Sequence, residues 1–144
     1  MPATNGRPIG ATNPMLLIAE LSYKCPLHCP YCSNPLAIAD ARYSDELSTD
    51  HWARVFHEAA DLGVLQLALT GGEPLVRKDA EELVRAATAA GLYSTLVTAG
   101  TPFTRRRAER LQAAGLDHVQ ISIQDSDPIE SDLIAGTKSF SKKV

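Results

Sequence analysis

The chain has 144 residues, of which 44% are hydrophobic and 22% charged, and its formal net charge is −3. This composition is typical of a soluble globular domain, and the mild negative charge gives no reason to expect nucleic acid or an anionic membrane as a partner. No apolar run approaches the roughly 20 residues that a membrane-spanning helix needs. Residues 1–14 lack the apolar centre of a signal peptide, so we expect a flexible tail there and a cytoplasmic protein whose cysteines stay reduced.

The first predicted strand, residues 15–21, leads into a loop that holds all three cysteines of the chain. Cys25, Cys29 and Cys32 follow the spacing C-x3-C-x2-C. Three thiolates on one short loop can hold three corners of a [4Fe-4S] cluster. The fourth iron then has no protein ligand, and an open metal position is typical of a reactive site rather than a structural one.

Other uses of these cysteines have to be compared with the cluster. A disulfide framework would use an even number of cysteines and would follow a secretory signal. A structural zinc site needs four ligands, and only His28 lies close enough in sequence to be the fourth. The stretch from Cys29 to Cys32 also looks like a glutaredoxin dithiol site, but there a helix lowers the thiol pKa, and Pro35 argues against a helix here. We therefore favour the cluster over a zinc-stabilised binding domain and a dithiol oxidoreductase.

Beyond the cysteine loop, helical and strand patterns alternate. Ser48 is a candidate N-cap of the first helix, in which apolar residues recur at helical spacing until Gly63. The later elements are a strand at 65–70, a helix to about residue 90, a strand at 93–98, a helix at 104–114 and a strand at 119–124. This order is typical of βα units on a parallel sheet with right-handed crossovers.

The predicted strands alternate between apolar and polar residues, although a parallel strand covered on both faces is normally apolar throughout. Leu67 and Leu69 alternate with Gln66 and Thr70, and successive strand residues point to opposite faces. One face of the sheet then packs on helices while the other lines a lumen, where Glu20 is a candidate polar residue. We interpret the fold as α/β, a partial, open TIM-like (βα) barrel truncated after about four strands. An antiparallel sheet with one solvated face fits the intervening helices less well.

Unusual sequences follow the predicted strands, at the end where βα barrels gather their functional residues. The second strand runs into Gly71-Gly72-Glu73-Pro74. A glycine pair lets backbone approach a ligand closely and direct carbonyl groups at a cationic amine, although such a pair by itself is more often only a turn. Thr98 and Ser122 lie at the ends of the third and fourth strands, where they would contact a ligand or merely cap the strand. We interpret the run of arginines from Arg105 to Arg110 as a solvated helix face, with a docking surface for an acidic partner as the alternative.

The cysteine spacing, with Tyr31 before the last cysteine and Gly71-Gly72-Glu73-Pro74 one strand later, resembles the signature of radical S-adenosylmethionine (SAM) enzymes. The resemblance implies that the three cysteines hold a [4Fe-4S] cluster whose open iron chelates the amino and carboxylate groups of SAM. It also implies that an electron from the reduced cluster splits SAM into methionine and a 5′-deoxyadenosyl radical. The residues that the resemblance assigns to SAM are Gly71, Gly72, Glu73, Pro74, Tyr31, Thr98 and Ser122.

A longer match, over residues 19–36, 69–74, 119–125 and 134–136, resembles the coenzyme PQQ synthesis protein E family, radical SAM oxidoreductases of pyrroloquinoline quinone (PQQ) biosynthesis. Members of this family join a glutamate and a tyrosine of a small precursor peptide by a carbon–carbon bond. A small peptide-chaperone protein presents the precursor, and an external electron donor reduces the cluster. The resemblance implies this function here, and another radical SAM peptide-modifying enzyme is the nearest alternative.

The chain departs from that family in two ways. The family has further barrel strands and a C-terminal cysteine-rich domain with auxiliary clusters, and no cysteine of this sequence lies beyond Cys32. We therefore expect residues 15–144 to be the N-terminal portion of a radical SAM core domain and the chain to be an incomplete form. No side chain stands out as a general acid or base, so we assign no catalytic residue.

Overall fold

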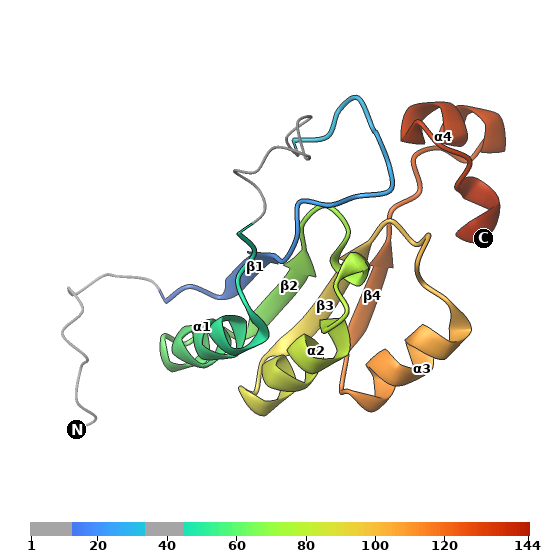
Figure 1. Cartoon of the computed structure of the whole chain (residues 1–144). Coiled ribbons are helices and arrows are strands. Elements are labelled where there is room, and N and C mark those ends of the chain that lie inside the picture. Colours follow the sequence, from blue (N-terminus) through green and yellow to red (C-terminus); the bar gives the residue numbers. More distant parts are fainter. Residues whose placement is uncertain (1–12, 34–44) are drawn as a thin grey trace, which may run out of the picture.

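A computed structural model describes residues 13–33 and 45–144 (Figure 1). They form a four-stranded sheet in the order β1-β2-β3-β4, so each strand pairs with its neighbours in the sequence. All three strand pairs are parallel. The strands are β1 (Leu16–Glu20), β2 (Gln66–Thr70), β3 (Tyr93–Thr98) and β4 (His118–Ile121). The predicted α/β fold is confirmed, whereas the tail predicted for residues 1–14 lies outside the described residues except for its last two positions.

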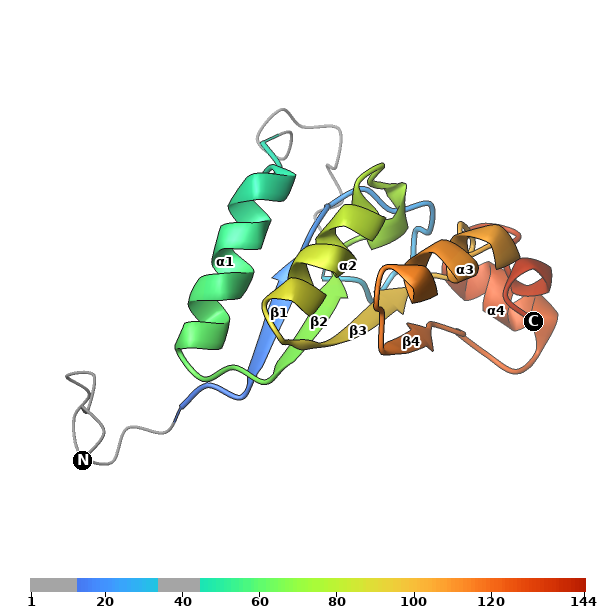
Figure 2. The ribbon, with the colours of Figure 1, turned by 90° about the horizontal axis from the view of Figure 1, so that it is seen from below.

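Three helices cover one face of this sheet: α1 (Thr49–Asp61), α2 (Ala80–Ala89) and α3 (Arg105–Ala113) (Figures 1 and 2). α1 begins where predicted, because the Ser48 side chain accepts a hydrogen bond from the His51 N–H. Thr104 caps α3 in the same way through the Arg107 N–H. Two of the three helices therefore start at a local capping signal, whereas Asp79 before α2 makes no capping hydrogen bond with its side chain.

The helix-covered face holds the main core. Leu67 and Leu69 of β2, Leu96 of β3 and Phe56 of α1 are almost completely buried together. The opposite face is open: Ile18 is 60% exposed, and it is in register with Ala68 of the neighbouring strand. Glu20 is exposed on this same open face, as predicted. A sheet that is covered on one side only is the open segment of a (βα) barrel that the alternation predicted.

The C-terminal part differs from the prediction. β4 ends at Ile121 rather than at residue 124, although the Ser122 N–H still donates to Thr98 O. Beyond the strand, the side chain of Lys143 donates hydrogen bonds to Ser122 O and Gln124 Oε1. Three further elements were not predicted from the sequence: α4 (Pro128–Ala135) and two short 3-10 turns, η2 (Pro74–Val76) and η3 (Phe140–Lys142).

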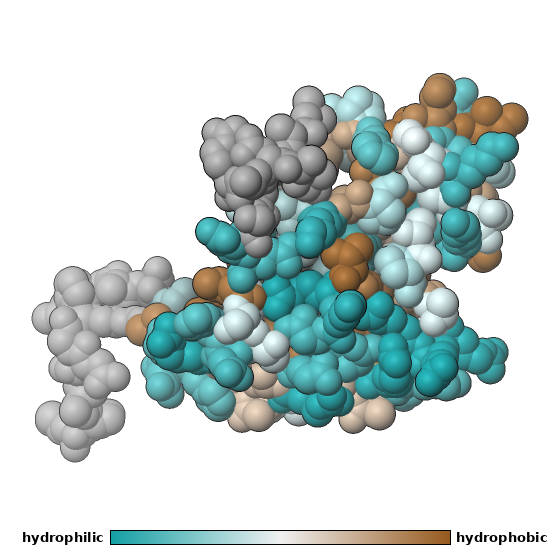
Figure 3. All heavy atoms as spheres, viewed as in Figure 1, coloured by the Kyte–Doolittle hydropathy of each residue, from teal (hydrophilic) through white to brown (hydrophobic). Residues whose placement is uncertain are grey.

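Helix α4 has local signals that could have revealed it. The Asp127 side chain accepts from the Ile129 and Glu130 N–H groups, and Pro128 occupies the first turn. Its pattern is nevertheless unusual, because the apolar Ile129 and Leu133 are 77% and 72% exposed. Figure 3 shows hydrophobic side chains gathered on α4, above a largely hydrophilic surface over the other helices. In the described part of the chain, no helix is long and apolar enough to cross a bilayer.

The predicted solvated arginine face is wrong for one of its members. The Arg107 side chain is only 17% exposed and lies 3.3 Å from Glu81 Oε1. Its two terminal nitrogens donate to the carbonyl groups of Leu75 and Arg77. Arg110 approaches the same Glu81 oxygen but is 55% exposed. Arg107 is therefore a structural contact between α3 and the segment after β2.

Candidate functional site

The loops at the C-terminal ends of the four strands surround a cavity of about 200 Å³. The predicted site residues that line it are Cys25, Cys29, Cys32, Tyr31, Gly71, Gly72, Thr98 and Ser122, and the remaining wall includes Leu27, Val97 and Gln124. Glu73 and Pro74 do not line it and are buried. The structure thus gathers residues separated by up to three βα units around one space.

The three cysteines lie on a loop with little hydrophobic anchoring. Cys25 and Cys29 are half-buried, Cys32 is exposed, and none of them forms a disulfide. The Leu27 N–H points at Cys25 Sγ at 3.4 Å, and Leu27 packs with Ala99 and Ala135. Backbone contacts complete the loop, since the His28 N–H donates to Ala135 O of α4.

The chemistry of this donor set fits an iron–sulfur cluster. Burial raises the pKa of the Cys25 thiol, and negative charge at Glu73, Cys32 and Cys29 raises the pKa further, against a lowering by the Leu27 N–H. Charged thiolates on this loop therefore repel one another, and a bound cation reverses this repulsion. Within residues 13–33 and 45–144, no three His, Cys, Asp or Glu side chains are grouped to hold a single ion. A [4Fe-4S] cluster does not need its three cysteine ligands around one point, because each of them binds a separate iron.

The close approach of backbone from the cysteine loop requires the glycine pair after β2. The Gly72 N–H donates to Ser22 O, and the Glu73 N–H donates to Lys24 O at 2.7 Å. A Cβ atom on Gly72 would lie 2.5 Å from the carbonyl oxygens of Lys24 and Tyr23, and one on Gly71 would collide with Ser22 O. We expected the missing side chains to admit a ligand. The structure shows that they admit the backbone leading into the cysteine loop, so hydrogen bonds join the two loops directly, and the approach of a ligand stays a prediction.

Glu73 connects this loop to the next one. Its carboxylate accepts hydrogen bonds from the Leu75 N–H, the Thr98 hydroxyl and the Ala99 N–H. The side chain is completely buried behind the cavity wall. These hydrogen-bond donors all belong to the chain itself, so the assignment of Glu73 as a SAM contact stays a prediction. Its hydrogen bonds make this part of the cavity wall rigid.

Lys143, which no sequence pattern predicted as a site residue, brings a positive charge to the cavity. Its Nζ donates to Ser122 O at 3.1 Å and to Gln124 Oε1 at 2.6 Å, and both of these residues line the cavity. Burial lowers the pKa of Lys143, while the charges of Cys29, Asp132 and Cys25 oppose that shift. A lysine near the end of a polar segment carries no sequence signal for such a role, because only the fold brings it here.

Tyr31 also lies at the cavity, 68% exposed. Burial of its hydroxyl and the negative charge of Cys29 raise the Tyr31 pKa, and a hydrogen bond with Gln124 lowers it. Tyr31 and Lys143 thus both contact Gln124, and the contact of Tyr31 links the cysteine loop to the segment after β4.

Residues 19–144 match the family model of the Radical SAM superfamily. The chain therefore belongs to this superfamily.

Two curated relatives are about 50% identical to this chain. The chain is 50% identical over 134 residues to the PqqA peptide cyclase of Xanthomonas axonopodis pv. citri (strain 306), covering 92% of this chain and 36% of that protein. It is 53% identical over 125 residues to the PqqA peptide cyclase of Rhizobium meliloti (strain 1021), covering 87% of this chain and 33% of that protein. The chain thus spans about a third of the length of these curated relatives.

Solved structures support the fold. The crystal structure of Streptococcus suis SuiB bound to S-adenosylmethionine superposes with a TM-score of 0.71 at 23% identity, over 86% of this chain and 27% of that chain. SuiB bound to its precursor peptide SuiA gives a TM-score of 0.72 at 24% identity, over 88% of this chain and 28% of that chain. At these identities the likeness concerns the arrangement of the elements alone.

Proposed function

We propose that the chain forms the [4Fe-4S]- and SAM-binding part of a radical SAM enzyme that joins a glutamate and a tyrosine of a small precursor peptide in PQQ biosynthesis. One observation carries this proposal: the three cysteines of the signature and the Gly71-Gly72 pair line the same cavity at the C-terminal end of the sheet. About 50% identity to proteins named PqqA peptide cyclase supports the substrate class.

Cys25, Cys29 and Cys32 are the residues that would hold the cluster. When bound, the cluster supplies the electron that cleaves SAM to a radical. Gly71 and Gly72 present bare backbone to the cavity, which suits the amino group of SAM. Lys143 places an ammonium group beside Ser122, where it favours the carboxylate group of SAM.

The remaining residues hold this arrangement and limit water. Glu73 fixes the Gly71-Gly72 loop to Thr98 and Ala99, so donors and acceptors are positioned before SAM binds. Leu27 and Val97 give the cavity an apolar wall, which keeps water from a radical. Thr98, Ser122 and Tyr31 remain proposed SAM contacts.

The proposal extends to partners and compartment. A small peptide substrate, its peptide-chaperone protein and an external electron donor follow from the family resemblance, and SuiB with its precursor peptide offers a structural parallel. A cytoplasmic location suits cysteines that form no disulfide.

Anaerobic reconstitution of the chain with iron and sulfide tests this proposal. We expect about four irons per chain, an electron paramagnetic resonance (EPR) signal that changes when SAM is added to the reduced protein, and formation of 5′-deoxyadenosine. Iron binding without any effect of SAM would contradict the SAM site. Thiol–disulfide exchange that needs only Cys29 and Cys32 would favour a dithiol oxidoreductase.

The peptide is tested in the same preparation. The precursor peptide is incubated with the loaded chain, SAM, reductant and the chaperone, and its mass is measured. A product lighter by two hydrogens supports the peptide assignment, because one new carbon–carbon bond replaces two C–H bonds. SAM cleavage with an unchanged peptide would limit the chain to uncoupled cleavage.

A further inference from the structure

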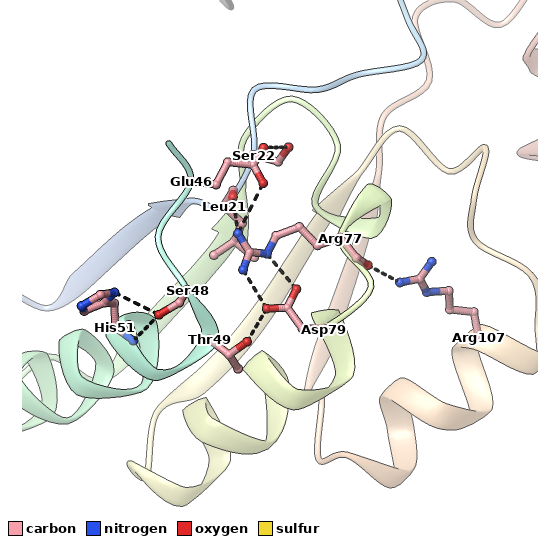
Figure 4. Close-up of polar contacts among 9 residues, drawn as sticks. All are labelled: Leu21, Ser22, Glu46, Ser48, Thr49, His51, Arg77, Asp79 and Arg107. Atoms are coloured by element: carbon pink, nitrogen blue, oxygen red, sulfur yellow. Dashed lines mark hydrogen bonds and ion pairs between the residues drawn. The ribbon is translucent and has the colours of Figure 1, made fainter. Parts of the chain in front are cut away.

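Arg77, directly after η2, has a guanidinium group that is 8% exposed and lies outside the cavity wall. Its Nε and Nη2 donate to the two carboxylate oxygens of Asp79 at 2.9 and 2.7 Å. Its Nη1 donates to Leu21 O at 3.1 Å and lies 3.5 Å from Glu46 Oε2 (Figure 4). A planar, bidentate arginine of this kind fixes its partners in direction as well as distance.

Of these partners, Leu21 and Glu46 are the two ends of the segment that carries the cysteines, and Asp79 precedes α2. The chain leaves the sheet at Leu21, and it returns at Glu46 just before α1. The two ends also meet directly, because Ser22 Oγ donates to Glu46 Oε1 at 2.7 Å. At the return end, Thr49 Oγ1 donates to Asp79 Oδ2 at 2.6 Å. Figure 4 shows Ser22, Glu46, Thr49 and Asp79 arranged around the guanidinium of Arg77.

The arginine itself is held in place from the other side. Arg107 of α3 donates to Arg77 O at 2.9 Å and to Leu75 O at 2.7 Å. Leu75 is completely buried. The backbone that presents Arg77 is thus fixed between the core and α3.

Polar contacts of this kind are needed because packing does little for the cysteine loop. Among residues 23–33, only Leu27 is buried. Backbone contacts with Gly72, Glu73 and Ala135 also hold this region, and Tyr31 adds a hydrogen bond with Gln124. A loop with so few buried apolar groups opens at low free-energy cost unless its ends are fixed.

We propose that Arg77 is a positioning residue, whose guanidinium joins both ends of the cysteine segment to the loop that begins with Gly71-Gly72 and so sets the place of the cysteines relative to the SAM-binding backbone. This role rests on the proposed function, because it concerns the same cavity. Arg77 acts through Leu21, Glu46 and Asp79.

The test compares two conservative changes with a matched control. Arg77→Lys keeps the charge but loses the planar fork, and Thr49→Val removes one hydroxyl from the return end. Arg85→Lys is the control, since Arg85 is 55% exposed and pairs with Glu82 on the surface of α2. Iron content, circular dichroism and the SAM-induced EPR change are measured on each reconstituted chain.

We expect Arg77→Lys to retain its circular dichroism and most of its iron while its affinity for SAM falls about 10- to 100-fold, the usual effect of losing a supporting contact. Thr49→Val should lower the affinity for SAM by a smaller factor, and Arg85→Lys should bind SAM as the parent chain does. Parent-like SAM affinity in Arg77→Lys overturns the proposal. If Arg77→Lys does not fold, a folded Thr49→Val with parent-like affinity overturns it instead.

Hydrogen exchange of the metal-free chain separates this proposal from the proposed function. In Arg77→Lys we expect faster exchange at the amides of Lys24 and Cys32, with that of Leu96 in the central strand β3 unchanged. The same exchange rates as the parent overturn the role of Arg77, whether or not the parent binds SAM. If exchange is faster in Arg77→Lys but the parent chain binds neither iron nor SAM, the result contradicts the proposed function and leaves the role of Arg77 in place.

Discussion

The hydroxyl group of Thr98 donates a hydrogen bond to the carboxylate of Glu73 at 2.9 Å, and both side chains are almost completely buried. Ala99 adds its N–H to the same carboxylate at 2.6 Å. The loops after β2 and β3 are therefore held together by one buried acceptor with several donors. Loss of any one of these donors should destabilise the contact, because a buried carboxyl group that lacks hydrogen bonds costs free energy.

Glu73→Gln should destabilise the chain by about 1–3 kcal/mol, since the new amide group faces N–H donors and leaves buried groups unpaired. Thr98→Val removes a hydroxyl that donates to Glu73 and accepts from the Gly100 N–H, so it should cost about 1–3 kcal/mol by leaving buried groups unpaired. Urea denaturation of the metal-free chain measures both. Glu82→Gln is the control, because Glu82 is 53% exposed on α2. A Glu73→Gln chain as stable as the control would contradict the importance of this carboxylate.

Local patterns in the sequence predicted the sheet and its covering helices. Leu67 and Leu69 alternate with polar residues and are buried against α1 and α2, as the period of a strand requires. Ser48 begins α1 because a serine at that position satisfies a helix N–H. Such features depend on neighbours a few residues away, which is why the sequence shows them.

The parts that the sequence did not show depend on contacts between distant residues. Lys143 reaches Ser122 across 21 positions, and Arg77 reaches Leu21 across 56. Arg107 looked like one member of a surface arginine run, yet it donates hydrogen bonds to carbonyl groups 30 and 32 residues away. The cavity was predictable because each signature follows a strand of a parallel sheet, whereas the contacts that hold its wall were not.

The three cysteines should act as a unit. Replacing Cys25, Cys29 or Cys32 with alanine should each remove the [4Fe-4S] signal almost completely, because two thiolates cannot hold the protein-bound corners of a cubane. Iron content and EPR after anaerobic reconstitution are the measurements. Ser33→Ala, at an exposed position of the same loop, should keep the cluster. A Cys25→Ala chain that still assembles four-iron clusters would contradict the assignment of Cys25.

Gly72→Ala should reduce iron content as well as SAM affinity. The new Cβ would lie 2.5 Å from the carbonyl oxygens of Lys24 and Tyr23, so the segment entering the cysteine loop has to move. We expect a loss of about 1–3 kcal/mol in stability, as for overpacking elsewhere. Gly91→Ala is the control, because its Cβ meets nothing within 4 Å although its φ of +76° strains the backbone. If Gly72→Ala kept full iron and lost only SAM affinity, the glycine would serve the ligand rather than the loop.

The stability of the chain should depend on pH through Asp79. Burial alone would raise the pKa of Asp79, but hydrogen bonds from Arg77 and Thr49 outweigh it and hold the pKa below the ordinary value. A carboxyl group whose folded pKa is depressed stabilises the fold above its unfolded pKa of about 3.9 and loses that contribution as pH falls through the folded value. The parent chain should therefore lose stability below about pH 4.

Asp79→Asn should be about 1.5–3 kcal/mol less stable than the parent near neutral pH, because it loses a charged partner of Arg77. Its stability should fall less steeply in acid, so the two curves converge as pH drops. Urea denaturation of the metal-free chains across the acid range measures both effects. Asp61→Asn, at the exposed last residue of α1, should follow the parent within about 0.5 kcal/mol. Parallel curves for Asp79→Asn and the parent would show that the Asp79 carboxylate is not the group whose protonation weakens the fold.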